Sequence, residues 1–116
     1  MNVNITISDQ PRLTNGFSTV SVQIPEIGVR EVLDISFEEL YESLGEPDPI
    51  TLDFVLIAGI VYLLDKGVRR RSTEDAWTRA FEVAFPVSSP RSWELAQASL
   101  QRALRFLTGD TWEIRF

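Results

Sequence analysis

The side chains of this 116-residue chain that could do chemistry are few, and most are acids or arginines. Glu38 and Glu42 stand one helical turn apart, and Glu74 precedes Asp75, so each pair offers a general acid and a general base. Asp53 stands inside an apolar stretch, where a carboxylate needs hydrogen-bond donors or a countercharge. Because exposed acid pairs are usually solvated, we assign neither pair a catalytic role.

The position of Asp53 near a helix start offers it a simpler role than acid catalysis. Asp48 and Pro49 form a helix start, an N-cap acceptor followed by a proline at the first helical position. We place Asp53 in the first turn of this helix, where free amides and the helix dipole favour a negative charge. Asp65 lies at the opposite end of the same helix, where a negative charge is disfavoured, so we expect an arginine such as Arg69 to pair with it.

The composition removes two large classes of chemistry. The chain has no cysteine and no histidine, which excludes disulfides, thiolate metal sites, cysteine nucleophiles and the commonest general base. It also lacks a GxSxG motif, a phosphate-cradling glycine loop, an HExxH motif and a calcium loop. The sequence therefore predicts a protein that is not an enzyme and has no catalytic, cofactor-binding or metal-binding residues.

Three consecutive arginines, Arg69, Arg70 and Arg71, form the most concentrated basic group in the chain. They follow a predicted helix end, where cations are stabilised by the dipole, but three successive loop side chains cannot all point at one helix end. Arginine is also the cation best suited to two-pronged recognition of carboxylates. We therefore predict that these arginines contact an acidic protein partner; a solvated loop is the alternative.

The charge is unevenly distributed along a chain whose net charge is -6. Residues 26–65 carry -9 and residues 66–116 carry +3. Net acidity argues against nucleic-acid binding, which depends on neutralising phosphates. The three tryptophans, Trp77, Trp93 and Trp112, fall at apolar positions of predicted elements, which favours core packing over base stacking.

Hydrophobic periodicity predicts strands and helices in a definite order. In the first half we expect strands at 4–8 and 17–24, a short third strand near 29–34, and a short helix from Ser36 to Gly45. The fourteen residues 51–64 are apolar on nearly every side. A bilayer-spanning helix needs about twenty such residues, so the stretch predicts a buried helix and no membrane partner.

The second half continues the alternation of helix and strand. We expect a strand at 76–85, a helix from Ser89 to Gly109 and a closing strand at 111–116. The predicted buried stripe of that helix consists of Trp93, Ala96, Leu100, Ala103, Leu104 and Leu107.

These elements predict a single α+β domain over residues 1–116. We expect a small, mostly antiparallel sheet of four to five strands packed on two main helices plus one short helix. The strand order and the oligomeric state stay open. The amino terminus lacks the basic start and apolar run of a secretory signal, so the expected location is the cytoplasm.

Five short motifs occur in an order that resembles one class of proteins. They lie at Val61–Tyr62, Asp65–Lys66, Trp77–Phe81, Phe85–Val87 and Phe106–Trp112. The pattern is similar to the amino-terminal region of 7-cyano-7-deazaguanine-synthase-like (queuosine-synthase-like) proteins encoded in bacterial antiphage defence clusters. The resemblance covers about the last sixty residues well and about the first fifty weakly.

The resemblance implies an accessory role and carries no catalytic residue with it. The family's ATP pyrophosphatase signature, SGGxDS, and its zinc cysteines are absent from this chain. The expectation is a non-catalytic docking domain without a cofactor, in a bacterial defence or nucleoside-modification system. Its partner would be a synthase-like catalytic unit or that unit's substrate protein. The alternative is a free-standing acidic inhibitor, an immunity protein or antitoxin, whose carboxylates imitate phosphate to block a nuclease.

Overall fold

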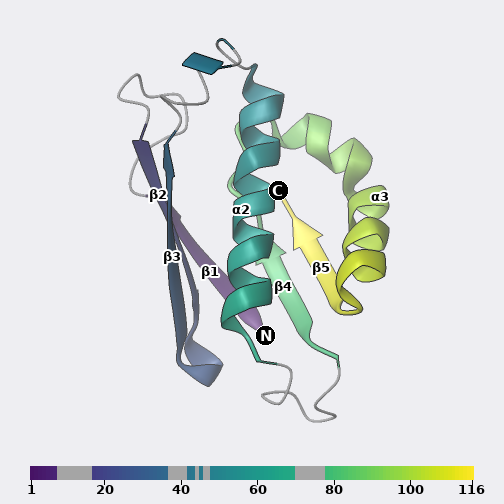
Figure 1. Cartoon of the computed structure of the whole chain (residues 1–116). Helices are drawn as coiled ribbons and strands as arrows, with labels where there is room; N and C mark the ends of the chain where they lie inside the picture. Colours follow the sequence, from purple (N-terminus) through teal and green to yellow (C-terminus); the bar gives the residue numbers. More distant parts are fainter. Residues whose placement is uncertain (8–16, 37–41, 44, 46–47, 70–77) are drawn as a thin grey trace.

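Five strands form one mixed sheet in the order β3-β2-β1-β4-β5, and two long helices lie against one of its faces (Figure 1). The computed structural model describes residues 1–7, 17–36, 42–43, 45, 48–69 and 78–116. Along the chain the elements are β1 (Asn2–Ile7), β2 (Phe17–Ile24), the 3-10 turn η1 (Pro25–Ile27), β3 (Val29–Ser36), α2 (Pro49–Gly67), β4 (Ala80–Ala84), α3 (Pro90–Thr108) and β5 (Thr111–Arg115).

The direction of each strand follows from the length of the connection before it. β1, β2 and β3 pair antiparallel, with Ile5 opposite Val22 and Val20 opposite Leu33. β4 pairs parallel to β1, and β5 parallel to β4, because each is reached through a helical crossover. Both crossovers place their helices on the same face of the sheet (Figure 1).

The α+β class, the two main helices and the number of strands are as predicted. The sheet is mixed, however, with two antiparallel and two parallel pairings, where we expected mostly antiparallel strands. The third strand, expected to be short, is a full strand of eight residues. β4 begins at Ala80, later than predicted, and the short helix predicted from Ser36 to Gly45 lies largely outside the described residues.

The core lies between the sheet and the two helices. Alternate strand residues point into it, including Val20, Val22 and Ile24 of β2, all without exposed surface. α2 supplies the largest helical share, with Leu52, Leu56, Ile57, Ile60, Leu63 and Leu64 buried. The predicted apolar helix is therefore buried on the side that faces the sheet, whereas Phe54 and Tyr62 on its other side are exposed. No helix among the described residues is long and apolar enough to cross a membrane.

The helix ends are set by local chemistry. Asp48 caps α2, where its Oδ1 accepts hydrogen bonds from the backbone N–H of Thr51 at 2.8 Å and from the Thr51 hydroxyl at 2.9 Å. These hydrogen bonds, with the backbone bond the larger cause, lower the pKa of Asp48 below its ordinary value. α3 ends at Gly109, whose φ of 74° is left-handed.

Replacing Gly109 with alanine should lower the free energy of unfolding by about 1 kcal/mol, because a side chain disfavours this backbone conformation. An added Cβ would meet nothing within 4 Å, so the cost comes from the backbone alone. Urea denaturation measures it. Gly109→Asn is the control and should lose less, since asparagine tolerates left-handed backbone better; equal losses would point to a different cause.

The buried stripe predicted for α3 is only partly correct. Leu104 is buried, and Trp93, Ala96 and Leu100 are half-buried, whereas Ala103 and Leu107 are exposed. The reason is that α3 lies beside the last strand of the sheet. A narrow strip of the helix therefore meets the core, and β5 is the element that packs most closely against it.

The edge strand β5 is partly covered by α3. The Thr111 N–H donates to the Arg79 carbonyl, and the Arg115 carbonyl accepts from the Phe85 N–H. Because the backbone groups of successive strand residues point in opposite directions, those of Ile114 point toward the free edge. Two glutamines of α3 cover them: Gln101 Oε1 accepts the Ile114 N–H at 2.9 Å, and Gln97 Nε2 donates to the Ile114 carbonyl at 2.7 Å. These bonds protect an edge that would otherwise be open to strand addition.

Candidate functional site

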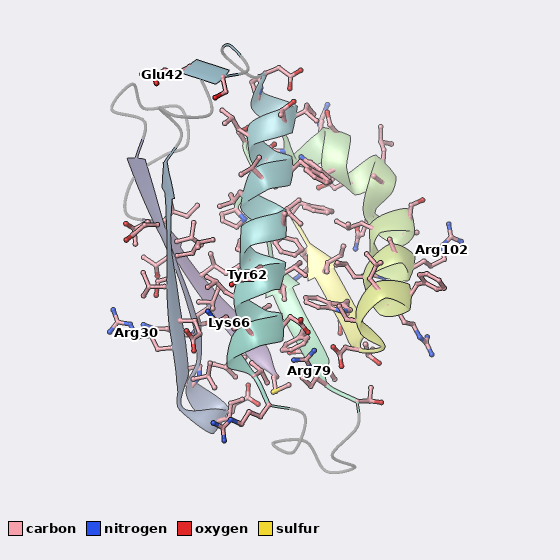
Figure 2. All side chains as sticks on the ribbon, viewed as in Figure 1. Arg30, Glu42, Tyr62, Lys66, Arg79 and Arg102 are labelled. Atoms are coloured by element: carbon pink, nitrogen blue, oxygen red, sulfur yellow. The ribbon has the colours of Figure 1, made fainter. Side chains whose placement is uncertain are left out.

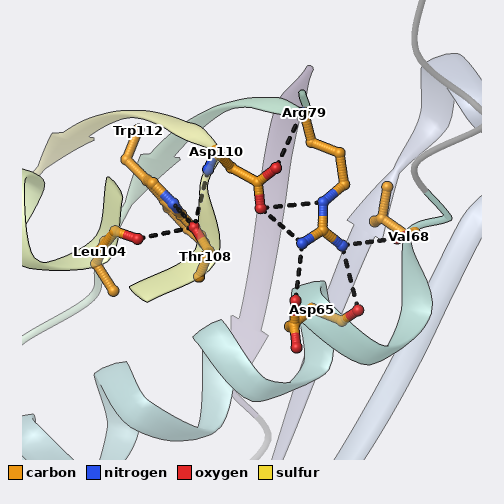
Figure 3. A network of polar contacts seen from close by, with 7 residues as sticks. All are labelled: Asp65, Val68, Arg79, Leu104, Thr108, Asp110 and Trp112. Carbon is orange, nitrogen blue, oxygen red and sulfur yellow. Dashed lines mark hydrogen bonds and ion pairs between the residues drawn. The ribbon is translucent and has the colours of Figure 1, made fainter. Parts of the chain in front are cut away.

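A buried arginine immediately before β4 ties together three parts of the fold (Figure 3). Arg79 is in phase with Phe81 and Val83, so the sheet geometry directs its side chain into the core, where it is 2% exposed. A cation there needs carboxylates and carbonyls around it. Asp65 and Val68 supply them from the end of α2, and Asp110 from the turn before β5.

All five N–H donors of the Arg79 guanidinium are used. Nε and Nη2 donate to Asp110 Oδ2 at 3.1 and 2.6 Å, and Nη2 also donates to Asp65 Oδ1 at 2.7 Å. Nη1 donates to the carbonyls of Asp65 and Val68, at 3.2 and 2.7 Å. The Arg79 backbone N–H donates to Asp110 Oδ1 at 3.0 Å. We call these four residues the Arg79 network.

The electrostatics of the Arg79 network keep the guanidinium charged. Burial by itself lowers the pKa of Arg79, but the hydrogen bonds and charges of Asp110 and Asp65 outweigh it and raise that pKa above its ordinary value. The group is therefore a permanent cation with no free donor. It can hold the structure together, but it cannot transfer a proton or bind a ligand without breaking existing bonds.

The Arg79 network unites residues from three of the motifs that carry the family resemblance: the aspartate after the Val-Tyr pair, the arginine of the Trp-Thr-Arg motif and the aspartate of the Thr-Gly-Asp motif. An arginine holds Asp65, as predicted, but it is Arg79 and not Arg69. The sequence feature that could have identified the Arg79 network is Arg79 itself, a charged residue among the apolar positions of a predicted strand.

A hydroxyl beside the Arg79 network fixes the turn before β5. Thr108 Oγ1 donates to the carbonyl of Leu104 at 2.8 Å and accepts from the Asp110 N–H at 3.2 Å and from the Trp112 indole at 3.0 Å (Figure 3). The Phe106–Trp112 motif is thus a helix-to-strand corner whose polar groups bond to one another.

Asp53 joins the start of α2 to the start of α3. It is 2% exposed, and its carboxylate accepts from the Ser88 N–H and hydroxyl, the Ser89 N–H and the Trp93 indole, at 2.7, 2.9, 3.1 and 3.0 Å. The prediction that the first turn of its own helix stabilises Asp53 is wrong, because no acid lies in the first turn of α2 and the amides that donate to Asp53 stand at the start of α3. Ser89 is the predicted N-cap of α3, yet its side chain makes no capping bond.

The other acids singled out from the sequence do not form a site in the described part of the chain. Glu42 is exposed, and Glu38, Glu74 and Asp75 lie outside the described residues. Among described positions there is no group of three or more histidine, cysteine, aspartate or glutamate side chains that could hold a metal ion.

The predicted basic contact surface is described only at its first residue. Arg69 follows α2 and is exposed, while Arg70 and Arg71 lie outside the described residues. Of the tryptophans, Trp112 packs in the core against Phe81, with ring centroids 4.7 Å apart. Trp93 is half-buried against the core, and Trp77 lies outside the described residues.

The most unusual surface feature is a set of apolar side chains on the solvent side of α3. Leu95 is 92% exposed and Phe106 is 88% exposed, and Ala103 is also exposed. Ala103 is eight residues after Leu95, and Phe106 is three residues after Ala103 and eleven after Leu95. These separations place all three on one side of the helix. The polar Ser99 and Arg102 stand between Leu95 and Phe106 on that side and are exposed as well. We call Leu95, Ala103 and Phe106 the α3 outer row.

A second, less exposed pair stands on α2, where Phe54 is 60% exposed and Tyr62 is 53% exposed. Isolated surface hydrophobics are ordinary, whereas contiguous exposed apolar patches mark contact surfaces. Sequence reasoning missed the α3 outer row because α3 carries apolar residues on more than one side. Periodicity alone does not say which side meets the sheet.

The chain was compared with protein-family models, with curated proteins and with solved structures, and none of the three comparisons finds a match.

Proposed function

We propose that this chain is a non-catalytic protein-interaction domain that docks through the α3 outer row. The supporting observation is the exposure of Leu95 and Phe106 on a helix whose opposite side already packs on the sheet. Fully burying each such side chain is worth about 1.5 to 3 kcal/mol, which a partner surface could supply. The fold itself does not use these residues.

We propose no catalytic role because Asp53, the acids of the Arg79 network and the buried arginine are already hydrogen-bonded or ion-paired within the fold. Asp53 accepts four hydrogen bonds, and Asp65 and Asp110 are held by Arg79. Each of these groups connects elements of the fold. None combines a free proton-transfer atom with a neighbouring nucleophile, which an acid-base site would require.

The proposed partner follows from the motif resemblance. It is a queuosine-synthase-like catalytic protein or that protein's substrate protein, in a bacterial defence or nucleoside-modification system, with the complex in the cytoplasm. An apolar docking row suits this role better than the inhibitor alternative, because an inhibitor that imitates phosphate would present carboxylates at its contact surface.

Changing the α3 outer row should abolish partner binding without unfolding the protein. The variant Leu95→Ser with Phe106→Ser removes two exposed side chains, so the thermal midpoint should stay within a few degrees of the original. The tagged chain is used to recover proteins from the native host, and mass spectrometry identifies them. We expect a synthase-like protein with the original chain and a loss of at least about tenfold with the variant.

The matched control is Phe54→Ser with Tyr62→Ser, which makes the same kind of change on α2. This variant should retain the partner if α3 is the docking helix. Recovery of the synthase-like protein by both variants would overturn the assignment to α3. Recovery of a nuclease in its place would favour the inhibitor function.

A further inference from the structure

A pocket of about 240 Å³ lies between α3 and the outer edge of β5. Its walls are Ala98, Gln101, Arg102, Arg105, Thr111 and Trp112. Figure 2 shows Arg102 on the side of α3 that faces away from α2. The pocket is smaller than the cavities that enclose drug-sized ligands, so it suits a single chemical group of a ligand.

The polar groups that line this pocket are mainly hydrogen-bond donors. Arg102 and Arg105 stand three residues apart on one side of α3, and neither side chain has an ion pair or hydrogen bond to a described residue. Gln101 uses its oxygen to accept from Ile114, which leaves the amide NH₂ as its free donor. The hydroxyl of Thr111 can also donate.

The backbone of β5 adds a further donor at this edge. The bonds of β5 to β4 involve Thr111 and Arg115, so the N–H of Trp112 points toward the free edge, as that of Ile114 does. Gln101 covers Ile114, and no equivalent side chain covers Trp112 among the described residues. The Trp112 N–H is therefore available at the pocket.

The charge of the pocket is opposite to that of the whole chain. No carboxylate of a described residue lines it, although the net charge of the protein is -6. The acids on the same two elements, Glu94 of α3 and Glu113 of β5, are exposed and lie outside the lining. Two cations and several neutral donors around one small space make it complementary to an anion.

We propose that this pocket binds a phosphate group. Its donors come from a helix, a strand backbone and a strand hydroxyl, and thus from several directions. A tetrahedral group with three or more acceptor oxygens can use such an arrangement more fully than a planar carboxylate can. The proposal does not rest on the docking function, because the pocket is formed by this chain alone and is tested without a partner protein.

Titration with inorganic phosphate, followed by amide NMR at constant ionic strength, tests the site. We expect saturable shifts confined to Thr111, Trp112 and the segment of α3 around Arg102 and Arg105. The variant Arg102→Gln with Arg105→Gln should weaken phosphate binding by about tenfold or more, since it removes both charges and their donor forks. Both residues are exposed, so the folded spectrum should persist.

The matched control is Arg91→Gln, an exposed arginine of the same helix that does not line the pocket. Its phosphate affinity should be unchanged. An equal loss in the control, equal affinity for acetate, or the absence of saturable shifts would each overturn the proposal. Adenosine monophosphate in a parallel titration identifies the source of the group: tighter binding than inorganic phosphate assigns an organic phosphate ester, and equal binding assigns free phosphate.

Discussion

Replacing Arg79 with methionine should lower the free energy of unfolding by about 3 to 5 kcal/mol, a large share of the 5 to 15 kcal/mol typical of a domain. Methionine keeps much of the volume but leaves the Asp110 carboxylate, 0% exposed, without the Arg79 countercharge. The carbonyls of Asp65 and Val68 lose the Arg79 donors as well. Breaking a buried ion pair from one side is costly because the remaining charge stays out of water.

Urea denaturation followed by circular dichroism measures this loss. Asp65→Asn is the matched control, since Asp65 is the other acid of the same arginine but its side chain is 60% exposed. Water can replace its contact, so the expected loss is about 1 kcal/mol or less. If Arg79→Met and Asp65→Asn destabilised the protein equally, the burial of the Arg79–Asp110 pair could not be the cause.

Replacing Asp53 with alanine should cost about 2 to 4 kcal/mol of unfolding free energy, since each buried donor left unpaired costs about 1 to 3 kcal/mol. The substitution leaves the N–H groups of Ser88 and Ser89 and the indole N–H of Trp93 without an acceptor at a partly buried junction. Water that enters the junction should hydrogen-bond to some of these donors and so reduce the total loss of unfolding free energy. The two helix starts should also separate more readily.

Chemical denaturation gives the free energy, and the fluorescence of Trp93 in the folded variant should report a more polar environment. Ser88→Ala is the control, because it removes one hydroxyl donor and keeps the carboxylate with its other three bonds. Its expected loss is about 1 kcal/mol or less. An Asp53→Ala protein as stable as the original would show that these bonds contribute nothing to the fold.

Local elements could be predicted from the sequence because their causes are local. The start of α2 follows from the cap formed by Asp48 and the proline after it, and the end of α3 follows from Gly109. β2 and β5 alternate apolar and polar residues as half-buried strands do. Each of these signals acts over a few residues, so no knowledge of the rest of the fold is needed.

The partners of the buried polar groups could not be predicted in the same way. Asp65 lies close to Arg69 in the chain, but Arg79, 14 residues away, enters the core and holds it. Asp53 was expected to serve its own helix, whereas it accepts from residues 35, 36 and 40 positions later. Which donor reaches which acid depends on how the helices pack, and spacing along the chain carries no information about that.

For most of the described elements the sequence by itself determined which segments become helix or strand, because propensity, capping and alternation are properties of neighbouring residues. Only the tertiary structure decided the strand order, the Arg79 network and the solvent side of α3. That helix carries apolar residues on more than one side, and its place beside the edge strand β5 selects Leu104 for the core and leaves Leu95 and Phe106 in water. The choice is made by packing against the sheet, which residues within the helix cannot specify alone.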